Sequence, residues 1–171
     1  MKDCNYEKVG SWKYFKSNLL VSLALFLSAI SSGIVIFKTE TIQISPQKQQ
    51  FIFLFHNNFL VCLTIIVAGL LSFGILGNFV LFANGVVVGR VIVGVYNLYG
   101  ITPLLRYLAP HFIFEISALL LATAISQETY KFFYNFRHPD IIKVIRLRYD
   151  LRAFVMMNIL LVIAALIESN L

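Results

Sequence analysis

The chain has 171 residues, of which 59% are hydrophobic and 13% are charged, and its mean hydropathy is +0.82. Soluble domains average about 45–50% apolar and about 25% charged residues, so this composition excludes an ordinary soluble domain and predicts a membrane protein. The net charge of +6 does not indicate nucleic-acid binding, because the basic residues flank apolar runs and the sequence contains no nucleic-acid-binding motif.

Five apolar runs are each about long enough to cross a bilayer, which takes roughly 20 residues. They cover residues 18–37, 51–76, 78–96, 103–126 and 151–168. The second and third runs almost touch, so a tight turn near Gly77-Asn78 would make them an antiparallel hairpin. Pro110 lies inside the fourth run, where it predicts a kink or a partly re-entrant segment. We therefore predict an all-α membrane protein with five transmembrane helices, in which residues 1–171 form a single membrane domain.

Lysine and arginine residues gather in two segments, the amino terminus and residues 127–152. With five spans these segments lie on the same side, and the excess of basic residues in cytoplasmic loops makes that side the cytoplasm. The prediction is a multi-pass protein of the cell membrane, with its amino terminus inside and its carboxyl terminus outside. Residues 127–150 are basic and rich in aromatics, and are predicted to form an interfacial segment, either a solvated linker or a helix on anionic lipid.

Seven of the polar or ionisable residues inside the second, third and fourth runs form one candidate group. A rise of about 1.5 Å per residue places them in the outer and middle layers of the bilayer. Polar groups in hydrocarbon are costly and normally face one another or a water-filled cavity. We therefore predict one buried polar cluster, with Arg90 and Glu115 as its ion pair. Its members are His56, Asn57, Asn58, Asn84, Arg90, His111 and Glu115.

The same residues leave a catalytic or metal-binding role open. His111 and Glu115 are four residues apart, so they share one face of a helix and are the candidates for catalysis. Together with His56 they are also ligand types that zinc accepts. The spacing lacks the second histidine of the HExxH metalloprotease motif, so a structural or partner-facing cluster is favoured. We expect no metal and no cofactor, and a non-catalytic role is favoured over an enzymatic one.

Gly85 and Gly89 form a small-xxx-small pattern in the third run. This pattern lets transmembrane helices approach closely. It predicts packing against the second or fourth span of the same chain, with a contact between two copies in a homo-oligomer as the less favoured alternative.

Three short motifs follow one another along the chain: HNNF at 56–59, FANGVVVGRV at 82–91 and APHFIFE at 109–115. Their order and spacing resemble the stage II sporulation protein M family, and the resemblance covers roughly residues 15–168. It implies a similar layout of five spans. The chain departs from the family pattern at Phe112, where glycine is frequent, and this argues against a role that needs backbone flexibility after His111.

The resemblance implies two settings. Sporulation members belong to a membrane complex that recruits cell-wall hydrolases during engulfment, whereas compact members accompany circular bacteriocins in peptide maturation, export or immunity. Because the chain has no sizeable soluble domain, we expect a membrane component of the second kind, acting as scaffold or peptide-binding subunit. The alternatives are a sporulation scaffold and an intramembrane peptidase or cyclase that uses Glu115 and His111.

The expected partners follow from the same reasoning. They are the lipid bilayer, other membrane subunits and a hydrophobic peptide. The sequence has no GxxxxGK[ST] motif, so any ATPase that drives export must act in trans.

Overall fold

The computed structural model describes residues 11–43, 50–137 and 147–170, and every regular element in these ranges is a helix. Five segments are long and apolar enough to cross a membrane. They are built on α1 (Ser11–Ile36), α2 (Phe51–Leu71), α3 (Ile75–Tyr99), α5 (Ala109–Ser126) and α7 (Leu147–Ser169). The prediction of an all-α chain with five membrane-spanning helices is confirmed.

Three shorter elements extend the fourth span. The three-residue α4 (Ile101–Pro103) and the π turn η1 (Leu104–Leu108) precede α5, and α6 (Thr129–Arg137) follows it. The helix α6 covers part of the predicted interfacial segment 127–150, whereas residues 138–146 of that segment lie outside the described residues.

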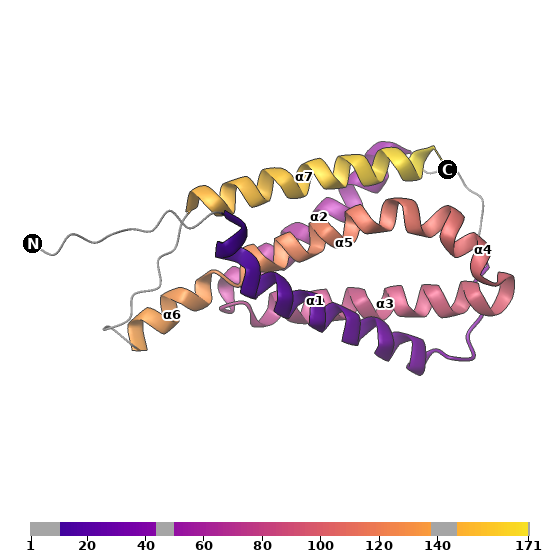
Figure 1. Ribbon diagram of the computed structural model, residues 1–171, viewed down its shortest axis with the longest axis horizontal. Coiled ribbons are helices and arrows are strands. Elements are labelled where there is room, and N and C mark those ends of the chain that lie inside the picture. The colour runs from indigo at the N-terminus through magenta and orange to yellow at the C-terminus, as the bar shows by residue number, and fades with distance from the viewer. Residues whose placement is uncertain (1–10, 44–49, 138–146, 171) are drawn as a thin grey trace, which may run out of the picture.

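The long helices lie side by side along one axis (Figure 1). We call the end where α1 and α7 begin the N-terminal end of the bundle, and the end where α2 begins and α7 finishes the C-terminal end. The turn between α2 and α3 lies at the N-terminal end, and α4 joins α3 to the fourth span at the C-terminal end (Figure 1).

The centre of the bundle is made by α2, α5 and α7. Small and apolar side chains on these helices are fully buried, among them Cys62, Ile65, Ala118, Ala122 and Met157. Small residues let the three helices approach one another, which replaces the hydrophobic driving force that is missing between helices in lipid. Large apolar side chains point outward from all five spans, as expected of a surface that faces hydrocarbon.

The helix α3 packs its glycines on α1. A Cβ atom at Gly89 would lie 2.2 Å from the Ile30 carbonyl oxygen, and one at Gly85 would lie 2.6 Å from the Cβ of Ala29. Gly33 on α1 fits against α3 in the same way, with the Val86 carbonyl oxygen 2.3 Å from where its Cβ would be. The prediction that these glycines pack on the second or fourth span was wrong. Ala29 and Gly33 form a second small-xxx-small pair, and it supplies the matching surface.

The turn between the second and third spans comes earlier than predicted. It occupies residues 72–74, where Phe73 and Gly74 have φ angles of 55° and 90°, and the Gly74 N–H donates to the Gly69 carbonyl oxygen at 2.7 Å. Such left-handed backbone favours glycine, and this bonding pattern ends helices. Gly77 instead lies inside α3, where a Cβ would meet the Ser126 hydroxyl oxygen at 2.6 Å. Its role is close packing and not the turn.

Candidate functional site

A polar cluster lies towards the C-terminal end of the bundle, between α2, α5 and α7. Asn58 Nδ2 donates a hydrogen bond to Glu115 Oε1. His111 stands one helical turn before Glu115, and only 7% of its surface is exposed. Glu168, in the last turn of α7, completes the group, because one ligand atom each from His111, Glu115 and Glu168 lies within 4.8 Å of the others. The cluster thus unites three predicted residues with Glu168, which the sequence analysis did not select.

A π turn precedes His111. Pro110 is the second residue of α5, and its ring nitrogen has no N–H to donate to the preceding turn. The Ala109 N–H donates to the Leu104 carbonyl oxygen, five residues earlier. The extra residue in this turn is accommodated without ending the helix, so helical structure continues without a break from α4 through η1 into α5. Single π turns of this kind occur frequently at functional sites.

The two neighbouring asparagines of α2 provide a matched test of the cluster. Replacing Asn58 by alanine removes a hydrogen bond to the Glu115 carboxyl group, and should lower the free energy of unfolding by about 1.5–3 kcal/mol, the range for hydrogen bonds to charged groups. Asn57 is exposed, so Asn57→Ala should have a much smaller effect. Loss of helical circular dichroism during titration with sodium dodecyl sulfate measures both, and equal losses would contradict the contact.

Four predicted members lie elsewhere. His56 and Asn57 are exposed on α2, and Asn84 Nδ2 donates to its own helix, to the Val80 carbonyl oxygen at 2.8 Å. The reason is helical geometry. Asn58 shares a face with the buried residues Leu54 and Cys62, four residues away on either side, whereas its two predecessors are rotated away from that face. The predicted seven-residue cluster was therefore too large.

Arg90 pairs with Glu40 and not with Glu115. Its Nε lies 2.8 Å from Glu40 Oε2, its Nη2 contacts Glu40 Oε1, and the guanidinium carbon lies 5.2 Å from the centre of the Phe37 ring. The pair is partly open, with side chains 47% and 27% exposed. The predicted Arg90–Glu115 ion pair was wrong, because the segment after α1 returns along α3 and brings a closer carboxylate. Asn97 fixes that segment through the Lys38 and Glu40 carbonyl oxygens at 2.9 and 2.8 Å.

The hydrogen bond from Arg90 holds the pKa of Glu40 below its ordinary value of 4.5. A lowered pKa in the folded protein means that unfolding is linked to proton uptake by this group. The contribution of the pair is therefore complete above the ordinary pKa of glutamate and is lost as the pH falls through the lowered value. Because the pair is exposed, salt should weaken it as well.

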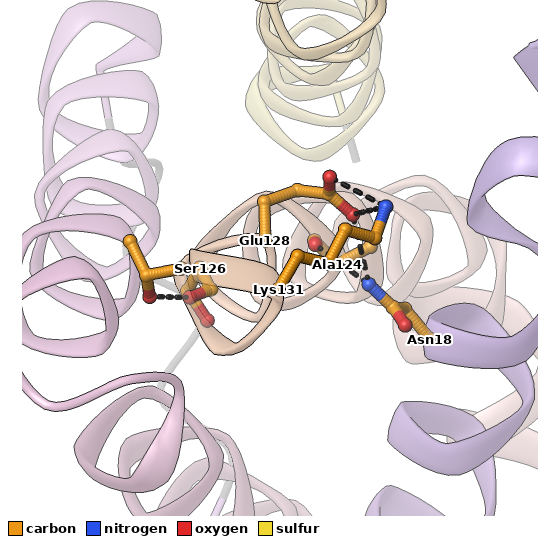
Figure 2. Close-up of polar contacts among 6 residues, drawn as sticks. Asn18, Ala124, Ser126, Glu128 and Lys131 are labelled. Atoms are coloured by element: carbon orange, nitrogen blue, oxygen red, sulfur yellow. Dashed lines mark hydrogen bonds and ion pairs between the residues drawn. The ribbon is translucent and has the colours of Figure 1, made fainter. Parts of the chain in front are cut away.

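A second polar cluster lies at the N-terminal end of the bundle, and the sequence analysis did not find it. Glu128 is only 3% exposed. Both of its carboxylate oxygens lie 2.7 Å from Lys131 Nζ, and Asn18 Nδ2 donates to it from α1 at 3.2 Å (Figure 2). Asn18 also approaches the Ala124 carbonyl oxygen at 3.4 Å. This cluster joins the end of α5 to α1.

Gln127 extends the second cluster to α3. Its Nε2 donates to Asn78 Oδ1 at 2.7 Å and to Ser22 Oγ at 3.2 Å. A signal was present in the sequence, since QE at 127–128 immediately follows an apolar run and Asn18 opens another. Both were assigned to segment ends, where polar residues are ordinary.

An apolar groove of about 1020 Å³ lies between α1, α5 and α7. Its walls are mainly leucines and other apolar side chains, including Phe15, Leu20 and Met156. Ser117 and Tyr149 add two hydroxyl groups, and Lys16 and Arg152 are the charged residues of the lining. Both belong to the part of the bundle near its N-terminal end, and the described residues place no ion-pair partner at either. The groove is thus apolar along its length and positive towards one end.

Five apolar helices packed through small residues, with polar clusters towards both ends, define a multi-span helical membrane protein. The chain belongs to the stage II sporulation protein M family, whose family model matches residues 22–171. The predicted resemblance to this family is thereby confirmed. Comparison with curated proteins and with solved structures gave no match.

Proposed function

We propose that this chain is a scaffold subunit that binds an apolar helical segment in the groove between α1, α5 and α7. The setting we favour is a membrane complex for maturation, export or immunity of a hydrophobic peptide similar to a circular bacteriocin. The observation that carries the proposal is the groove itself, about 1020 Å³ in volume and lined by apolar side chains of three helices.

The dimensions of the groove favour a helix as its occupant. Its wall on α1 extends from Phe15 to Leu23, which is roughly 12 Å of helix, or about two turns. An apolar helix leaves no backbone polar group unsatisfied in lipid, whereas an extended segment would. Two turns of an amphipathic or apolar helix in a groove of this kind is a common mode of peptide recognition.

Charge complementarity specifies the occupant further. Lys16 and Arg152 line the groove, so the segment that fits has an acidic side chain where it reaches them. A phospholipid, with its acyl chain in the groove and its phosphate at the two cations, is the competing occupant. The experiment must separate the two.

The test uses the full chain in nanodiscs of phosphatidylcholine and two fluorescent apolar helical peptides, one with a terminal glutamate and one with glutamine in its place. The acidic peptide should bind more tightly, and Arg152→Gln should remove about fivefold of that affinity, equivalent to about 1 kcal/mol for one solvent-accessible pair. Arg148, exposed on the first turn of α7 and outside the groove lining, provides the control variant Arg148→Gln, which should change nothing.

Three outcomes would overturn the proposal. Equal binding of the two peptides would contradict the claim that the groove cations favour an acidic segment. Equal effects of Arg152→Gln and Arg148→Gln would contradict the claim that the peptide binds in the groove. Displacement of the acidic peptide by phosphatidylglycerol, with that lipid retained by the purified chain, would make the groove a lipid site.

A second function is favoured by the proximity of His111, Glu115 and Glu168. These groups could serve an intramembrane peptidase or cyclase, with Glu115 and His111 as its catalytic pair. Processing of an added precursor by the purified chain, abolished by Glu115→Gln at unchanged expression, would replace the scaffold proposal with this one. The family's sporulation name supports the third setting, a scaffold in engulfment, and the same groove would serve it.

A further inference from the structure

We propose that His111, Glu115 and Glu168 bind a divalent transition-metal ion of the zinc class, which joins α5 to α7 near the C-terminal end of the bundle. One ring nitrogen of His111 and one oxygen from each carboxylate already lie within 4.8 Å of one another. Ligand atoms around a tetrahedral zinc ion stand roughly 3.4 Å apart, given bond lengths of about 2.0–2.2 Å. Small side-chain rotations therefore suffice to close the site.

A buried nitrogen atom independently indicates a missing ligand. His111 is 93% buried, and its Nδ1 atom forms no hydrogen bond of normal geometry with the described residues, its one backbone interaction being with Tyr107 in the preceding turn. Buried polar atoms in native proteins are nearly always satisfied, by protein, by water or by an ion. An imidazole with an unsatisfied nitrogen, placed beside two carboxyl groups, is the arrangement from which zinc ligands are drawn.

The charges of the cluster favour a cation. Glu115 and Glu168 approach each other inside an apolar bundle, and within the described ranges neither forms an ion pair with a basic side chain. Two unpaired carboxylates at this depth are unfavourable, and a divalent ion would neutralise both. Glu168 also lies in the last turn of α7, where the helix dipole favours positive charge.

The ligand types select the class of ion. One imidazole and two carboxylates suit zinc and its neighbours, whereas calcium and magnesium prefer oxygen ligands alone. Asn58 would not bind the metal itself but would orient a ligand, because its side-chain amide donates a hydrogen bond to the Glu115 carboxyl group. Such outer contacts orient the ligand, and their loss typically weakens metal binding by about 10- to 100-fold.

This site is separate from the α1–α5–α7 groove, whose lining includes none of the three ligands. The metal proposal and the proposed function can therefore fail independently. Metal was disfavoured from the sequence because the spacing is not that of the HExxH motif, and the third candidate ligand there was His56. The structure places His56 on an exposed face and brings Glu168 to the site instead.

The experiment loads the metal-stripped full chain with Zn²⁺ alone, after purification in detergent through a tag that contains no histidine. Elemental analysis should give about one zinc per chain, and competition with a chromogenic chelator gives the affinity. Glu168→Gln should weaken binding by at least tenfold and Asn58→Ala by about 10- to 100-fold. The control variant His56→Ala should bind zinc as the unchanged chain does.

Folding is verified for each variant by a single gel-filtration peak and an unchanged helical circular dichroism spectrum. Co²⁺ provides a second readout, because its visible absorption reports a low-coordinate site with a nitrogen ligand and should disappear in Glu168→Gln. The proposal is overturned if the folded, unchanged chain retains no stoichiometric zinc. It is also overturned if His56→Ala reduces binding as much as Glu168→Gln does.

Discussion

Replacing Gly89 by leucine should separate α1 from α3 and cause a large loss of stability, matched at the surface between these helices by Gly33→Leu. A Cβ at this position would lie 2.2 Å from the Ile30 carbonyl oxygen and 3.0 Å from the Gly33 Cα. Both neighbours are backbone, so no side-chain rotation relieves the clash. Overpacking in a core costs about 1–3 kcal/mol where side chains can adjust, and we expect the upper end of this range.

The control for this prediction lies on the same helix. Ala83 is exposed on α3, so Ala83→Leu adds the same type of side chain on a face turned to lipid. Unfolding by sodium dodecyl sulfate, followed by circular dichroism, should show a clear loss for Gly89→Leu and almost none for Ala83→Leu. Similar curves for the two variants would contradict the α1–α3 contact. Gly33→Leu, on the opposing helix, should behave like Gly89→Leu, because its Cβ would meet the Val86 carbonyl oxygen at 2.3 Å.

Replacing Glu128 by alanine should destabilise the N-terminal end of the bundle by about 3–5 kcal/mol, the usual cost of removing one partner from a buried ion pair. The change removes both oxygens that contact Lys131 and the acceptor of the Asn18 amide (Figure 2). The Glu128 and Lys131 side chains are only 4% and 16% exposed, so water replaces the lost contacts poorly.

The partly exposed ion pair between Arg90 and Glu40 provides the matched comparison. Glu40→Ala also removes a glutamate that contacts a basic side chain, but its partner Arg90 is 47% exposed. Surface ion pairs contribute little to stability, so the Glu40 variant should unfold nearly as the unchanged chain does. If Glu40→Ala lowered the stability more than Glu128→Ala under the same conditions, the claim that the Glu128 cluster stabilises the bundle more than the Arg90–Glu40 pair would be wrong.

The five spans could be predicted because hydropathy over about 20 residues is a local property of the chain. The boundary at 72–74 could not be placed in the same way. The apolar run continues from Leu71 to Leu76, and both Gly74 and Gly77 are plausible turn residues from their type alone. Gly77 is needed inside α3 instead, because it packs against Ser126 from a distant part of the chain.

The polar contacts depend on which helices become neighbours, and this is why only part of the site could be predicted. The estimated depth of each residue in the bilayer left Glu115 as the carboxylate available to Arg90. In the structure, residues 37–43 run back along α3 and place Glu40 beside Arg90 instead. Glu168 could not be predicted as a member of the site for the same reason. It lies in the last turn of the last span, and nothing local shows that α7 packs beside α5.

Gly85 and Gly89 illustrate the same limit. Their spacing correctly predicted a close helix contact, because the absence of side chains is a local feature. The identity of the partner was wrong, although Ala29 and Gly33 were visible in the sequence. The pair on α3 can be matched with the pair on α1 only when these two helices are known to be neighbours. The order of the spans along the chain favoured α2 as the partner of α3 instead.

The central claim is that the groove between α1, α5 and α7 holds an apolar helix, and site-specific photocrosslinking in native membranes tests it most directly. A photoreactive amino acid at position 20 faces the groove, because Leu20 lines it and is 56% exposed. The same amino acid at position 53 is the control, since Phe53 is 62% exposed on α2 and lies outside the groove lining. We expect position 20 alone to yield one peptide adduct, identified by mass spectrometry as an apolar segment with an acidic side chain at one end. Lipid adducts alone at position 20, or the same adducts from both positions, would contradict the account.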